Sequence, residues 1–80
     1  MQLGDSVIFE DYYHNDLVSG IVVTTGRGDL TGYFEVMSTR RELTGAPTSD
    51  PYTFWTDRED LFSIDEWEEW GKEEYGELLR

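Results

Sequence analysis

The chain has 80 residues, no cysteine and a formal net charge of −12. Without thiols it can form neither a disulfide nor a thiolate zinc site, so a small apolar core rich in aromatic residues must stabilise it. The charge opposes direct binding to nucleic acid or to anionic membranes and attracts basic partners. Because residues 1–20 lack a basic, apolar leader and no apolar run approaches the length of a membrane span, we expect a cytoplasmic protein.

Short runs of alternating or β-branched residues predict strands along most of the chain. Gly20 lies inside the second of these runs and predicts a bulge or bend there. Residues 39–51 show no period and predict a long loop. We expect strands at residues 6–10, 17–25, 33–38, 52–56 and 61–64, with a helical turn at 57–61 before the last of them.

The C-terminal residues 65–79 have the pattern of an amphipathic helix. Ser63 and Glu66 have the spacing of a capping box, which predicts the helix start beside them. We expect Trp67 and Trp70 to anchor this helix to the rest of the domain, and Gly71 or Gly76 to stop or bend it. The predicted apolar stripe consists of Trp67, Trp70, Gly71, Tyr75 and Leu78.

Three short motifs resemble those of the SH3-like small barrels: Gly4-Asp5-Ser6-Val7, Gly20-Ile21-Val22 and Asp60-Leu61. The resemblance implies a single, mainly β domain over residues 1–80, in which a five-stranded SH3-like barrel (3–64) precedes the C-terminal α-helix. It implies binding rather than catalysis, although the ALYDY-type sequence of signalling SH3 domains is absent. The expected core comprises Val7, Phe9, Val18, Val22, Phe34, Val36, Phe54 and Leu61.

Acidic residues crowd the end of the chain, where residues 57–80 contain ten acids and three bases. On a helix, Asp65, Glu69, Glu73 and Glu77 form a row of like charges at i, i+4, which costs about 0.2–0.5 kcal/mol for each pair. A row that weakens its own helix indicates either a solvated face that only keeps the protein in solution, or a surface that meets a cationic partner. The predicted partner-binding residues are Asp57, Glu59, Asp60, Asp65, Glu66, Glu68, Glu69, Glu73, Glu74 and Glu77.

The leading hypothesis is a non-enzymatic inhibitor or regulator that binds a basic protein surface by imitating nucleic acid. In size and charge the chain resembles the small acidic anti-defence proteins of phages and mobile elements, which block restriction or CRISPR machinery. That resemblance implies a partner whose basic groove normally holds DNA or RNA. We expect a monomer or weak dimer.

Two alternatives stay open. An aromatic groove formed by Tyr12, Tyr13, Tyr52 and Trp55 would make the protein a module that grips a basic or Pro-rich peptide. A small subunit of a larger assembly would instead bury the aromatic residues of its helix against another chain.

Catalysis and metal binding have little support in the sequence. His14 is the single histidine, and it has no companion ligands at a metal-binding spacing. The sequence contains no nucleophile motif, phosphate-binding loop or dinucleotide-binding motif, and it contains no calcium-binding loop. We therefore expect neither an enzyme nor a bound cofactor.

Overall fold

The computed structural model describes residues 1–11, 16–41 and 51–75. The five predicted strands are present, and their ends differ from the prediction by at most three residues. They are β1 (Ser6–Asp11), β2 (Asp16–Thr25), β3 (Tyr33–Arg41), β4 (Thr53–Asp57) and β5 (Phe62–Ser63). The helical segments are η1 (Gly28–Leu30), η2 (Arg58–Asp60), α1 (Ile64–Glu66), η3 (Trp67–Gly71) and α2 (Lys72–Glu74).

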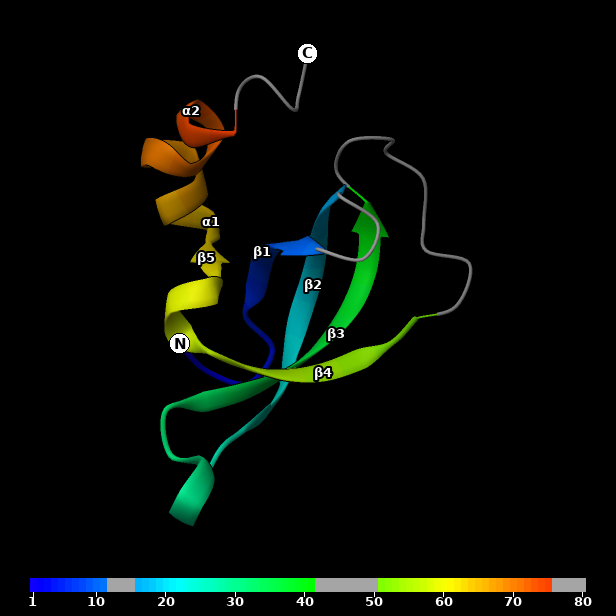
Figure 1. The fold of residues 1–80 in the computed structure, drawn as a ribbon, viewed down its shortest axis with the longest axis vertical. Coiled ribbons are helices and arrows are strands. Elements are labelled where there is room, and N and C mark those ends of the chain that lie inside the picture. The colour runs from blue at the N-terminus through cyan, green and yellow to red at the C-terminus, as the bar shows by residue number, and fades with distance from the viewer. Residues whose placement is uncertain (12–15, 42–50, 76–80) are drawn as a thin grey trace.

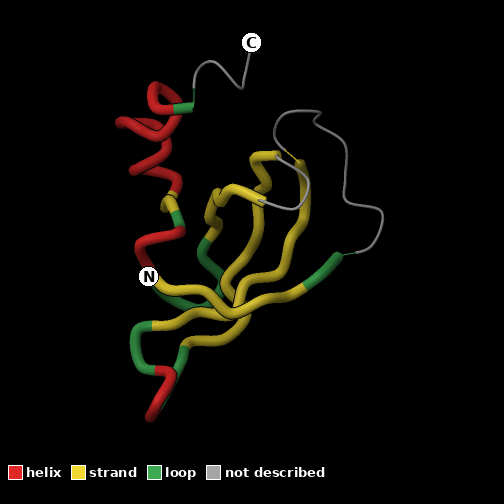
Figure 2. Tube along the Cα trace, viewed as in Figure 1, coloured by secondary structure: helices red, strands yellow, loops and turns green. Residues whose placement is uncertain are grey.

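The strands form one antiparallel sheet in the order β4-β3-β2-β1-β5 (Figure 1). In the described residues β4 and β5 are the two edges and do not pair with each other, so the sheet is not shown to close into the predicted barrel. Helix α1–η3–α2 stands beside β1 and β5, while η1 lies at the tip of the β2–β3 hairpin (Figure 2). Strand β3 extends to Arg41, so the first residues of the predicted loop, 39–41, belong to a strand instead. Residues 42–50 lie outside the described part.

Gly20 lies at an irregularity of the β2–β3 pairing, where the register shifts between Ser19 and Gly20. A Cβ atom on Gly20 would lie 2.6 Å from the carbonyl oxygen of Met37 and 2.8 Å from a methyl carbon of Val36. Because only glycine allows β3 to approach this closely, the predicted bulge is confirmed and has a packing reason.

The predicted core is confirmed as one hydrophobic cluster. Val7 and Phe9 project from the same face of β1, and the ring of Phe9 meets that of Phe54 edge-on with 4.8 Å between centroids. Each fully buried side chain of this type contributes about 1.5–3 kcal/mol to folding. Val7, Phe9, Val18, Val22, Val36 and Leu61 are buried, and Phe34 and Phe54 pack against them.

A second cluster, absent from the predicted core, covers the other face of β1. Ile8 and Leu17 are buried there with Phe62 of β5 and Trp67 of η3, and Tyr75 packs against them. Strand β1 is therefore covered on both faces, and the helix supplies the second cover. The prediction that Trp67 anchors the helix is confirmed.

The helix starts as its sequence predicts and then departs from α geometry. Ser63 accepts a hydrogen bond from the Glu66 amide while the Glu66 carboxylate accepts one from the Ser63 amide, which confirms the capping box. The Lys72 amide then donates to the carbonyl of Trp67, five residues back, which defines η3 as a π-helical turn. None of the helical segments in the described residues has the length and apolar character needed to cross a bilayer.

Gly71 neither stops nor breaks the helix but closes this π turn. A Cβ on Gly71 would lie 2.5 Å from Cε3 of Trp67 and 3.3 Å from Cδ1 of Phe62, so the missing side chain makes room for two aromatic rings. The described helix ends at Glu74 and a turn follows at Tyr75. The predicted continuation to residue 79, with Gly76 and Leu78, lies outside the described residues.

Candidate protein-binding surfaces

The helix presents four carboxylates to solvent without a counter-charge. Asp65, Glu69, Glu73 and Glu74 are exposed, and no hydrogen bond or ion pair joins their side chains to another residue of the described part. We call these four residues the acidic face. Glu77, the last member of the predicted row, lies outside the described residues.

The π turn changes how the acidic face lines up. In a regular α-helix, residues eight apart differ by about 80° around the axis, because each residue advances about 100°. One extra residue in the turn reduces the effective separation of Asp65 and Glu73 to seven positions, or about 20°. The same shift brings Tyr75 onto the side of Trp67, and their rings stack with centroids 6.2 Å apart.

Two of the predicted partner-binding acids have intramolecular partners instead. Glu66 accepts a 2.6 Å hydrogen bond from the Arg58 guanidinium, in addition to its bond from the Ser63 amide. The bond from the Ser63 amide and then the one from Arg58 hold the pKa of Glu66 below its usual value of 4.5. Glu68 pairs with Lys72 at 2.8 Å, one helical turn away.

The acids near η2 are divided among different surroundings. Glu59 is exposed, whereas Asp57 is partly covered and its Oδ1 atom is buried without a hydrogen bond. Asp60 accepts a bond from the Thr56 hydroxyl at 3.3 Å. Of the nine predicted residues that the structure describes, those of the acidic face and Glu59 are exposed and have no hydrogen bond or ion pair within the described part.

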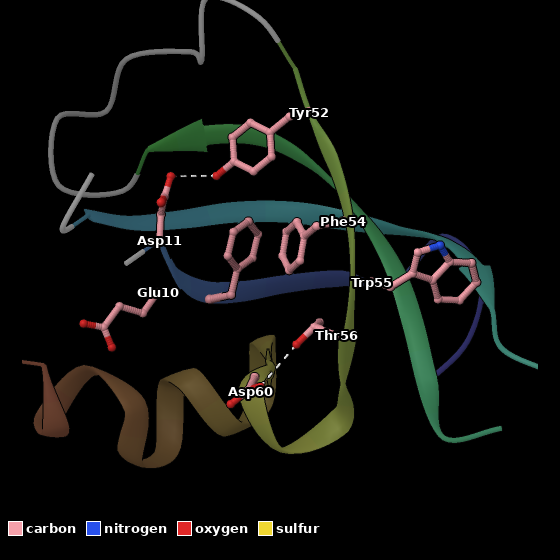
Figure 3. Close-up of a pocket in the computed structure, with 8 residues that line it drawn as sticks. Glu10, Asp11, Tyr52, Phe54, Trp55, Thr56 and Asp60 are labelled. Atoms are coloured by element: carbon pink, nitrogen blue, oxygen red, sulfur yellow. Dashed lines mark hydrogen bonds between the residues drawn. The ribbon is translucent and has the colours of Figure 1, made fainter. Parts of the chain in front are cut away.

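A groove of about 450 Å³ lies between β1 and β4 (Figure 3). The rings of Phe9 and Phe54, which meet edge-on, both line it, and the ring of Tyr52 lies 6.1 Å from that of Phe54. It is lined by Phe9, Glu10, Asp11, Tyr52, Phe54, Trp55, Thr56 and Asp60.

Hydroxyl groups orient the carboxylates around this groove. The Tyr52 hydroxyl donates to Asp11 at 2.8 Å, and the Tyr75 hydroxyl, from the end of the helix, donates to Glu10 at 3.1 Å. The neutral Tyr75 hydroxyl leaves the Glu10 carboxylate with further acceptor sites. The groove therefore combines aromatic walls with acidic ends.

The groove predicted from the sequence overlaps this one only in part. Tyr52 and Trp55 both line it, but Figure 3 shows the Trp55 ring on the other side of β4 from Phe54, as alternation along a strand requires. Tyr12 and Tyr13 lie outside the described residues, as does His14. Acids next to these aromatic residues were expected in the groove, and the structure identifies Glu10 and Asp11, at the end of β1, among its lining residues.

No group of three or more possible metal-ligating side chains occurs among the residues that the structure describes. A comparison with family models, curated proteins and solved structures finds no match to this chain. The acidic face and the groove are therefore the basis of the proposed function.

Proposed function

We propose that the protein is a non-enzymatic inhibitor or regulator that binds a basic surface of another protein through its acidic face. The supporting observation is that, among the described residues, Asp65, Glu69, Glu73 and Glu74 are exposed and unpaired, whereas the two other acids of the helix, Glu66 and Glu68, are paired. Like charges on one helix repel each other, and cationic groups of a partner would remove that cost. Long-range attraction to a protein of net charge −12 would speed the encounter.

In this proposal the partner is a protein that normally holds nucleic acid in a basic groove. The alignment of Asp65 with Glu73 across the π turn supports this idea, because it places two carboxylates along one side of the helix. The proposal includes anti-defence activity, because the chain is similar in size and charge to the small acidic anti-defence proteins of phages.

We also propose that the sheet is part of an SH3-like barrel. The order of strands, with a 3-10 turn at Arg58–Asp60 before β5, supports it, as does the bend at Gly20. The subunit alternative expects the helix to bury its aromatic residues on another chain, whereas Trp67 is buried against the sheet of its own chain.

The test compares charge reversals at two places. Glu69→Lys and Glu73→Lys alter the acidic face, whereas Asp29→Lys alters the exposed turn η1 by the same two units of charge. Partners are captured from host lysate at low salt, eluted with a salt gradient and identified by mass spectrometry. We expect nucleic-acid-handling proteins that duplex DNA displaces, and we expect the helix variants, separately or together, to lose them while Asp29→Lys retains them.

Equal binding by the helix variants and by Asp29→Lys would overturn the proposal, because the net field would then matter and the helix would not. Binding that persists in molar sodium chloride would also contradict it, since screening at that concentration acts within about 3 Å.

The groove supports a second candidate, a module that grips a basic peptide. Aromatic walls favour a cation, and Glu10 and Asp60 each accept only a hydroxyl donor among the described residues. In this case Glu10→Gln with Asp60→Asn would weaken binding, the helix reversals would leave it unchanged, and salt would weaken it less. The same capture experiment therefore separates the two candidates.

A further inference from the structure

Trp70 is an exposed indole on a helix that buries its other tryptophan. Its exposed fraction is 47%, against 5% for Trp67, so the prediction that both residues anchor the helix holds fully only for Trp67. The Trp70 ring nevertheless has a fixed neighbour, because it meets Phe62 edge-on with 4.8 Å between centroids and 68° between planes. The structure thus holds a large aromatic surface in place while leaving almost half of it in water.

Three residues of the acidic face are close to Trp70 along the helix. Residues three and four positions apart are neighbours on a helix, with about 5–6 Å between Cβ atoms, which puts Glu73 and Glu74 beside Trp70. Glu69 precedes it directly. All three are exposed and belong to the acidic face. An apolar partner for Trp70 would have to bury these charges, whereas a cationic side chain would satisfy both the ring and the carboxylates.

We infer that Trp70 is the anchor of the acidic face, where its indole stacks against an arginine side chain of the basic partner and Glu73 and Glu74 accept hydrogen bonds from the guanidinium. This inference rests on the proposed function. Tryptophan binds cations best among the aromatic residues, and the planar, weakly hydrated guanidinium can stack on a ring while it donates in its plane. The contact with Phe62 lowers the entropy lost on binding, because the ring is already positioned.

A purely structural role would be to shield Phe62 from water. Trp70→Leu separates the two roles, because leucine still covers Phe62 but offers no aromatic face. Tyr33→Leu is the matched control: Tyr33 is 42% exposed, similar to Trp70, but it lies on β3 and does not line the groove. Urea unfolding of each variant checks the fold, and Trp70→Phe retains an aromatic ring.

The probe is a capped peptide of four Gly-Arg repeats, with lysine and citrulline peptides of the same length as controls. Calorimetric titration at low salt should show that Trp70→Leu weakens binding of the arginine peptide about fivefold, as loss of a cation–π contact of about 1 kcal/mol requires. Trp70→Phe should lie between it and the wild type, and Tyr33→Leu should match the wild type. The lysine peptide should bind more weakly, and the neutral citrulline peptide should not bind.

Unchanged binding by Trp70→Leu would overturn the inference, as would an equal loss in Tyr33→Leu. Lysine binding as tight as arginine would overturn the assignment to arginine. The proposed function fails separately: it falls if Glu69→Lys and Glu73→Lys retain the captured partner. It stands, without the Trp70 anchor, if those reversals abolish capture and Trp70→Leu has no effect on the peptide.

Discussion

The two hydrophobic clusters of this protein differ in how they are built. The first is formed largely by aliphatic side chains that alternate along β1, β2 and β3 and are joined by a continuous antiparallel ladder. The second joins the helix to the sheet through rings gathered on Phe62, which contacts Trp67, Trp70 and Tyr75 edge-on. The pairing of β5 with β1 covers only two residue pairs. The sheet is therefore stabilised by many small contributions, whereas the helix depends on a few large ones.

Loss of the Trp67 side chain should weaken the attachment of the helix to the sheet most severely. Trp67→Ala deletes the largest side chain of the second cluster and should lower the free energy of unfolding by about 3–5 kcal/mol. Urea unfolding measures the loss, and amide hydrogen exchange locates it. We expect protection to fall first in residues 62–75 and to persist in β2 and β3. Simultaneous loss of protection in both regions would show that the two clusters unfold as one.

A methyl group at Gly71 should have a smaller effect of the same kind. Alanine is the better helix former by about 1 kcal/mol, but its Cβ would meet the Trp67 ring at 2.5 Å. We expect the clash to prevail and Gly71→Ala to destabilise the protein by about 1–3 kcal/mol, as overpacking does. Glu73→Ala is the control in the same helix, because residue 73 is exposed. A more stable Gly71→Ala variant would mean that the rings can move aside.

The smallest expected effect is the pH dependence of the helix start. The bonds from the Ser63 amide and from Arg58 lower the pKa of Glu66 in the folded protein, so the unfolded chain binds its proton more readily. The stabilisation is present above the usual value of 4.5 and disappears as the pH falls through the lower folded value. Thermal unfolding of wild type and Glu66→Gln should therefore differ at neutral pH and converge in acid. A difference that persists in acid would assign the effect to packing rather than to charge.

Much of the sheet follows from local patterns. Alternation in β1 and β3 puts Val7 with Phe9 and Phe34 with Val36, and these pairs do meet in the first cluster. The cap at Ser63 depends on four consecutive residues and is equally readable. Ile8 and Leu17 were not predictable in this way, because alternation assigns them to the outer face and only the later packing of the helix covers it.

The candidate site is less accessible to sequence reasoning, because it depends on contacts between distant parts of the chain. Glu10 and Tyr75 are 65 positions apart, and Asp11 and Tyr52 are 41 apart. The partial exposure of Trp70 also lies beyond the pattern, since a stripe of uniform α-helical period contains no π turn. The acidic character of the face was predictable from the sequence. The hydrogen bond that Glu66 accepts from Arg58 was not, because it depends on how the chain folds.

The pairing of β1 with β5 has a consequence for biosynthesis. Val7 lies opposite Ser63, so β1 is translated before the segment that pairs with it. At about 5–20 residues per second, roughly 3–11 seconds separate their translation. Throughout this interval the side chains of Ile8 and Leu17 lack the cover that Phe62 and Trp67 later supply, and apolar surface exposed in this way favours aggregation.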